Sequence, residues 1–241
     1  LKGDCIESIG SGSADTIIDC KGKLVTPGFV DSHTHLIFNN LRTEEHQMRL
    51  SGATYEEIAN NGGGIVSSVE SVQSATTKEL FNIAIPRLDR FISMGTTTIE
   101  AKSGYGLNTE SELKSLKVIS KLSEEHAIDI IPTFMGAHAF PVEYEDKKDA
   151  YVDLVINEMI PEIEKQGIAK FIDVFCEEGY FDIDQSKRIL QAGISAGLKP
   201  RVHADEFHNF GASLMAGEMG AVSADHLMKI DEKGIRSLKN N

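Results

Sequence analysis

Short apolar runs alternate with amphipathic stretches along the chain from Pro27 onward. The runs are rich in β-branched residues, as in buried strands, and the stretches between them have helical periodicity. The expected strands are Gly28–His35, Thr96–Lys102, Asp129–His138, Phe171–Glu177, Pro200–Ala204 and Ala221–His226. The helices expected between them include Glu110–Glu125, Ala150–Gln166 and Gln185–Ala196. This alternation predicts an α/β fold with a parallel sheet.

The first 26 residues have a different pattern. Short extended segments are separated by Gly, Ser and Asp turns, and they hold too few apolar residues for a core of their own. We expect residues 1–26 to form part of a small β domain and residues 27–241 to form the main domain.

Residues that can ligate, titrate or hydrogen-bond stand at the ends of most predicted strands. They are His35, Lys102, His138, Cys176, Glu177, His203 and His226. A (β/α) barrel assembles its active site at the C-terminal ends of successive strands. An open doubly wound sheet instead concentrates its chemistry near one switch point. The pattern therefore favours a barrel.

The first predicted strand carries a pair of histidines. His33 and His35 are two positions apart, so both side chains point to the same face of a strand. Such a pair alone is weak evidence for a metal site. However, this strand is apolar and follows a Pro-Gly turn, and buried imidazoles need partners or a metal ion. We therefore interpret the pair as candidate metal ligands.

Several longer motifs resemble the imidazolonepropionase family of the amidohydrolase superfamily, and together they cover nearly all of residues 24–230. They are PGFVDSHTH, GATY, GGGI, KSGYGL, MGAH, DVFCE, HADE and DHL. The HxH and HADE motifs are shared across the superfamily. The combination of KSGYGL, MGAH and the GATY…GGGI block is specific to this family.

The resemblance implies a (β/α)8 barrel with a small β-sandwich domain and a metal-dependent hydrolase. The family opens the ring of 4-imidazolone-5-propanoate with water to give N-formimidoyl-L-glutamate, in histidine degradation. By position, His33, His35 and His203 match metal ligands. The residues that match substrate-binding positions are Arg42, Tyr55, Tyr105 and His138, and those that match catalytic positions are Glu206 and His226.

The expected cofactor is one divalent metal ion, zinc or iron. Dinuclear relatives bridge two ions with a carboxylated lysine at the end of strand 4, and the predicted fourth strand ends without a lysine. Cys176 is expected to be a small buried apolar residue rather than a ligand. The superfamily has eight strands and takes its fourth ligand, an Asp, from the end of strand 8. We therefore expect that Asp beyond Asn241, and we expect the 241 residues alone to be inactive.

Composition and charge limit the classes of molecule that the protein is expected to bind. The formal net charge of -13 is spread along the chain and argues against nucleic acids and anionic membranes, but not against a small anionic substrate. The three cysteines form no disulfide framework, and no signal peptide is apparent, which favours the cytoplasm. The family resemblance also implies a homodimer.

Two other functions stay open on the sequence. A mononuclear cytosine- or guanine-type deaminase shares the HxH and HxxE motifs, but it binds neutral bases and would leave Arg42 and KSGYGL unexplained. A non-catalytic barrel that has kept the fold would be favoured if the histidines bound no metal.

Overall fold

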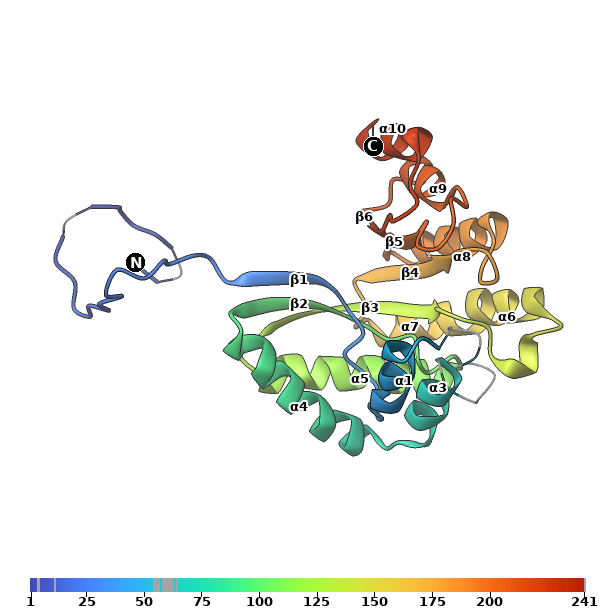
Figure 1. Cartoon of the computed structure of the whole chain (residues 1–241), viewed down its shortest axis with the longest axis horizontal. Coiled ribbons are helices and arrows are strands. Elements are labelled where there is room, and N and C mark those ends of the chain that lie inside the picture. The colour runs from blue at the N-terminus through green and yellow to red at the C-terminus, as the bar shows by residue number, and fades with distance from the viewer. Residues whose placement is uncertain (4, 11, 54–56, 58–62, 64, 241) are drawn as a thin grey trace.

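The computed structural model describes the chain except residues 4, 11, 54–56, 58–62, 64 and 241. Six strands form one parallel sheet in sequence order (Figure 1). They are β1 (Phe29–Thr34), β2 (Thr96–Lys102), β3 (Asp129–Ala137), β4 (Phe171–Cys176), β5 (Lys199–Ala204) and β6 (Ser223–His226). All six strands expected from the sequence are present, with ends shifted by no more than two residues.

Helices follow the strands and cover the outside of the sheet (Figure 1). They are α1 (Thr43–Leu50), α3 (Ile65–Ser74), α4 (Thr77–Ser93), α5 (Thr109–Glu125), α6 (Lys148–Leu154), α7 (Ile160–Gln166), α8 (Ile183–Ser195), α9 (Ala212–Glu218) and α10 (Glu232–Asn240), with the 3-10 turn η1 (Val142–Tyr144). Capping boxes begin two of them, at Thr76 with Glu79 for α4 and at Asp182 with Gln185 for α8. Each box satisfies N–H groups that have no partner within the helix.

The helix expected over residues 150–166 is interrupted. A π-helical turn, η2 (Val155–Met159), joins α6 to α7. Pro161 lies at the start of α7. Because proline has no N–H to donate to the preceding turn, a regular α-helix cannot continue through it undisturbed, and a π-turn accommodates the break.

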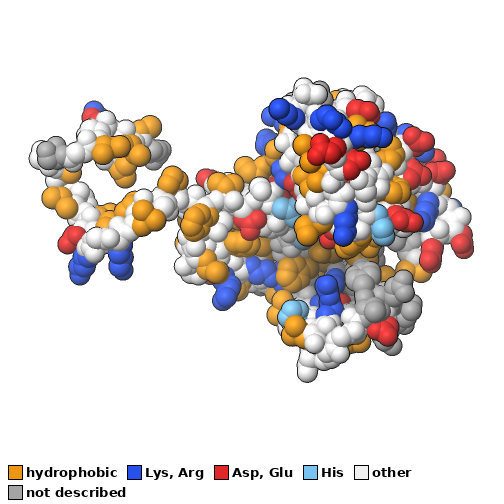
Figure 2. Space-filling view, turned by 45° about the horizontal axis from the view of Figure 1, so that its top comes forward, with side chains coloured by type: hydrophobic (Ala, Val, Ile, Leu, Met, Phe, Trp, Pro, Cys, Tyr) orange, Lys and Arg blue, Asp and Glu red, His pale blue; other side chains and the backbone are white. Residues whose placement is uncertain are grey.

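The N-terminal residues extend away from the barrel as an arm (Figures 1 and 2). The described residues of 1–26 contain no strand, only an isolated antiparallel bridge between Lys2 and Cys5. Large apolar side chains on the arm are open to solvent, with Ile18 at 83% and Leu24 at 88% exposure. The division into a small β domain and a barrel domain remains a prediction.

The sheet is curved, so that side chains of its first and last strands meet. His33 Nδ1 on β1 lies 2.9 Å from Asp225 Oδ2 on β6. Arg201 on β5 donates from Nη2 to the Ser32 carbonyl on β1, at 2.8 Å. The concave face carries the polar side chains, while the helix-facing side is apolar and includes the fully buried Ile99. The six strands thus form most of a (β/α) barrel, as predicted.

Among the described residues, no helix has the length and apolar character to cross a membrane.

Candidate metal centre and active site

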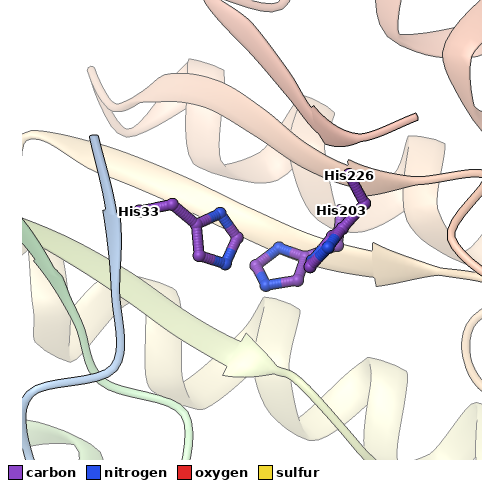
Figure 3. A group of neighbouring side chains, drawn as sticks. All are labelled: His33, His203 and His226. Carbon is purple, nitrogen blue, oxygen red and sulfur yellow. The ribbon is translucent and has the colours of Figure 1, made fainter. Parts of the chain in front are cut away.

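Three histidines from three strands meet on the concave face. His33 lies in β1 and His203 in β5, and their ring centroids are 4.4 Å apart. His226 ends β6, with its ring 5.0 Å from each of these two rings. Figure 3 shows His33 pointing across toward His203, with His226 beside His203. The nitrogens of these three side chains lie within 4.8 Å of one another.

His35 lies one residue beyond the end of β1, rather than inside the strand as predicted. It still shares a side with His33, since the two ring centroids are 5.4 Å apart. Its Nε2 lies 3.3 Å from His203 Nε2, and its buried Nδ1 has no hydrogen-bond partner among the described residues. His35, His138 and His203 form a second group within 4.8 Å.

The three predicted ligands therefore do not form one compact group. His203 belongs to both groups, while His33 is in one of them and His35 in the other. The three rings are nevertheless neighbours, because His35 Nε2 lies 3.3 Å from His203 Nε2 and the ring centroids of His33 and His203 are 4.4 Å apart.

Burial favours the neutral form of three of the histidines, His35, His138 and His203. It lowers the pKa of His203 to about 4 and that of His138 to about 3. It also holds the pKa of His35 well below its usual value, with help from the neighbouring His138 and His203. Neutral imidazole is the form that binds a metal ion. A neutral, convergent set of nitrogens that includes an unpartnered buried Nδ1 fits a divalent cation.

Tyr105 and His138 are held by a shared loop. The Glu112 carboxylate accepts hydrogen bonds from the backbone N–H groups of Gly104, Gly106 and Leu107, at 2.8–3.2 Å, so the loop before α5 is fixed from inside. His138 lies just after β3 and donates from Nδ1 to the Gly104 carbonyl, at 2.9 Å. That hydrogen bond leaves His138 Nε2 available toward the cavity.

The rings of His138 and Tyr105 lie beside His35. His138 is nearly parallel to His35, with 4.7 Å between centroids, and Tyr105 is 5.6 Å away. Gly104 has a φ of +105°, and a Cβ there would lie 3.1 Å from His138 Nδ1. Glycine is therefore needed at this position both for the backbone conformation and for the close approach.

Glu206 stands on the turn after β5, two residues beyond its last strand position. The preceding Asp205 accepts backbone hydrogen bonds from Phe210, Gly211, Ala212 and Ser213, which fixes the turn onto the start of α9. Glu206 Oε2 lies 3.5 Å from His226 Nε2. The two residues predicted to be catalytic are thus brought together from neighbouring strands.

Arg42 precedes α1 and reaches the same cavity. Its Nε donates to Glu45 Oε2 at 2.8 Å, and among the described residues no other partner is seen for its guanidinium. The terminal nitrogens can therefore meet an anionic group. Tyr55 lies outside the described residues, so its predicted role stays a prediction.

All these side chains face one cavity of about 380 Å³. Its lining comprises His33, His35, Arg42, Ile65, Tyr105, His138, Phe175, Tyr180, His203, Glu206, Phe207 and His226. Ile65 and the three aromatic residues Phe175, Tyr180 and Phe207 were not identified from the sequence, because apolar residues at strand and helix ends resemble ordinary core residues. Cys176 is fully buried, and its burial raises the thiol pKa to about 12, so at neutral pH it is a protonated, apolar side chain as expected.

A buried group of charged residues below the histidines was also missed. The Lys102 ammonium lies 2.6 Å from Asp173 Oδ2 and 2.8 Å from Glu100 Oε1. Asp173, His203 and Asp225 form a third group whose ligand atoms lie within 4.8 Å, and Lys102 Nζ is within 3.7 Å of both carboxylates. The sequence feature that could have revealed this group is the presence of charged residues within otherwise apolar strands.

Comparisons with known proteins agree with the fold. Residues 16–104 match the amidohydrolase family. The solved 5-methylcytosine deaminase of Klebsiella pneumoniae with bound phosphonocytosine superposes with a TM-score of 0.62 at 18% identity, over 87% of this chain and 48% of that one. The adenine deaminase of Arthrobacter aurescens gives 0.51 at 13% identity, over 85% and 63%. At such identities the likeness concerns the fold alone.

Sequence relatives are much closer. Imidazolonepropionase of Brevibacillus brevis is 54% identical over 222 residues, which are 92% of this chain and 52% of the relative. That of Alkaliphilus metalliredigens is 47% identical over 247 residues, 99% of this chain and 58% of the relative. The chain thus spans little more than half the length of these relatives. Over its own length, the chain is similar in sequence to these imidazolonepropionases.

Proposed function

We propose that the protein carrying this chain hydrolyses the ring of 4-imidazolone-5-propanoate to N-formimidoyl-L-glutamate, using one divalent metal ion, zinc or iron. The observation that carries the proposal is the convergence of eight residues matched to the family's site on one cavity of about 380 Å³, with His35 and His203 Nε2 3.3 Å apart. A deaminase that acts on neutral bases would not need a cationic side chain in this cavity, yet Arg42 lines it.

His33, His35 and His203 would hold the metal. A divalent ion at this position would supply Lewis-acid activation of water and of the ring carbonyl. The fourth ligand implied by the family resemblance, an Asp of the eighth barrel strand, is expected beyond Asn241.

Glu206 and His226 would act in proton transfer. Their side chains are 3.5 Å apart at the cavity wall, so a proton taken up by one can pass to the other. Glu206 then protonates the departing ring nitrogen, which makes the amidine nitrogen a better leaving group. His226 holds the carboxylate in place and helps to orient the attacking water.

The remaining residues would bind and orient the substrate. The Arg42 guanidinium offers its terminal nitrogens to the propionate, as a charge-assisted pair. Tyr105 and His138, fixed by the Glu112-bound loop, place flat and polar surfaces beside the imidazolone ring. The aromatic side chains of Phe175 and Phe207 add apolar surface to the cavity lining.

The test is turnover by the full-length protein, with its metal content measured by emission spectroscopy. We expect about one divalent ion per chain and ring opening of imidazolone propanoate, with no turnover of cytosine or guanine. Turnover of the bases alone would replace the proposal with a deaminase. A folded protein that retains no metal would favour a non-catalytic barrel. A homodimeric state and a cytoplasmic location remain predictions from the sequence.

A further inference from the structure

Below the candidate metal ligands lies a buried group of charged side chains that the proposed reaction does not use. We call it the charge cluster, and it comprises Glu100, Lys102, Asp173, Arg201 and Asp225. Its members come from four strands, β2, β4, β5 and β6, and all point to the concave face. The side chains of Lys102 and Asp173 are both 0% exposed.

Two carboxylates of the charge cluster contact two different metal-ligand candidates. Asp225 Oδ2 lies 2.9 Å from His33 Nδ1. Asp173 Oδ2 lies 3.0 Å from His203 Nδ1, a close contact whose alignment is poorer than that of a hydrogen bond. In both histidines the contact occupies Nδ1 and leaves Nε2 for another partner.

Lys102 holds both carboxylates at once. Its ammonium lies 2.6 Å from Asp173 Oδ2 and 3.7 Å from Asp225 Oδ2, and Glu100 Oε1 is a third neighbour at 2.8 Å. Arg201 fixes Asp225 from the other side, since its Nη2 is 3.2 Å from Asp225 Oδ2. The position of each carboxylate is therefore determined by fixed cations rather than by solvent.

The charge balance of the cluster also favours a neighbouring cation. Three carboxylates face two cationic side chains, which leaves one net negative charge in a region shielded from water. An excess buried charge is costly unless it is paired. A cluster that only stabilised the fold would be expected to balance its charges. A divalent ion on the far side of His33 and His203 would offset the excess.

We propose that Asp173 and Asp225 are positioning residues for the metal centre, and that Lys102 couples them. Each carboxylate keeps the proton of its histidine on Nδ1 and turns Nε2 toward the metal. Carboxylates in this relation to ligating histidines fix the tautomer and raise the basicity of the ligand. The inference rests on the metal site of the proposed function.

The test compares zinc dissociation constants, measured by chelator competition on the full-length protein. Asp173→Asn and Asp225→Asn keep the side-chain shape but lose the negative charge. Each should weaken zinc binding by about 10–100-fold. The matched control is Tyr151→Phe, which removes another fully buried contact, the hydrogen bond from the Tyr151 hydroxyl to the Gly136 carbonyl at 2.8 Å. It should leave the zinc affinity unchanged.

A purely structural role for the carboxylates makes a different prediction. It would lower the melting temperature of the chelator-treated protein in the Asn variants without changing the zinc affinity, and that result would overturn the inference. If Asp173→Asn does not fold, Asp225→Asn decides the matter, because Asp225 is partly exposed, at 14%, and tolerates substitution better.

The visible spectrum of the cobalt-substituted protein gives a second readout. Loss of positioning should change the cobalt absorption bands in the Asn variants but not in Tyr151→Phe. Unchanged bands together with unchanged affinity would reject the inference while leaving the metal site intact. A wild-type protein that binds neither zinc nor cobalt would instead reject the proposed function.

Discussion

At the scale of single residues, Arg42 is the residue proposed to recognise the carboxylate of an anionic substrate. Its Nε is already paired with Glu45 at 2.8 Å, so one carboxylate holds the guanidinium while its terminal nitrogens face the cavity. The pair with Glu45 restricts the conformations of the Arg42 side chain. Under the proposed function, its terminal nitrogens would bind the carboxylate of the substrate.

We therefore expect Arg42→Ala to weaken binding of imidazolone propanoate by about 1.5–3 kcal/mol, the usual contribution of a hydrogen bond to a charged group. An analogue without the carboxylate should lose much less affinity. Inhibition constants for the two ligands, measured on both proteins, give the comparison. Equal losses for both ligands would remove Arg42 from the substrate site.

Glu206 is the second residue whose role can be isolated. Glu206→Gln preserves the shape of the side chain but cannot take up and release a proton. Turnover should fall by roughly 10²–10⁴-fold, the usual contribution of a general acid–base group. Steady-state kinetics and metal analysis of the same preparation check this. Because Glu206 contacts His226 rather than the three ligands, the metal content should be nearly unchanged, and loss of metal would make Glu206 a ligand.

At the scale of secondary-structure elements, Lys102 joins strands that are far apart in the sequence. It ends β2 and contacts Asp173 on β4 and Asp225 on β6. The contacts with Asp173 and Glu100 raise its pKa above the usual value, although burial acts in the opposite direction. Its charge is therefore kept in the protein interior, where it holds three strands in register.

Lys102→Met should cost about 3–5 kcal/mol of unfolding free energy, because it leaves buried carboxylates without their cation. The matched control is Lys121→Met on α5, whose lysine is 51% exposed and pairs with Glu125 at 3.6 Å. That change should cost well under about 1 kcal/mol. Denaturant unfolding in the presence of a chelator measures both. Similar small losses would show that the charge cluster does not hold the strands together.

At the scale of the whole molecule, the described sheet has two open edges. Its order runs from β1 to β6, so β1 pairs only with β2, and β6 only with β5. The β1 edge is apolar, with Phe29 at 59% and Val30 at 67% exposure. An exposed apolar edge strand is a template for pairing with another chain.

A polypeptide of residues 1–241 should therefore self-associate at micromolar concentration, as measured by light scattering after gel filtration. Val30→Lys should increase the monomer fraction, because a lysine on an edge strand disfavours pairing. Val25→Lys, equally a valine at an exposed position but outside the strands, should have little effect. A wild-type preparation that is monomeric throughout would contradict this prediction.

The sequence by itself determined the strands, their order and most of the cavity. Strands of buried β-branched residues are specified locally, so their positions could be predicted to within two residues. Residues at strand ends, such as His138 and His226, could be assigned to one site because parallel strands all point their C-terminal ends to the same rim. The Pro161 π-turn, in contrast, was not predicted, since the helical periodicity continues through it.

Only the tertiary structure decided which side chains touch. Asp173 lies within an apolar strand, and nothing in its local sequence shows that it meets His203, 30 positions later. That contact depends on the register between β4 and β5 and on the side of the sheet that each residue faces. The His33–Asp225 contact depends further on the curvature of the sheet, which is a property of all six strands together. The curvature brings these two side chains, one on β1 and one on β6, within hydrogen-bonding distance.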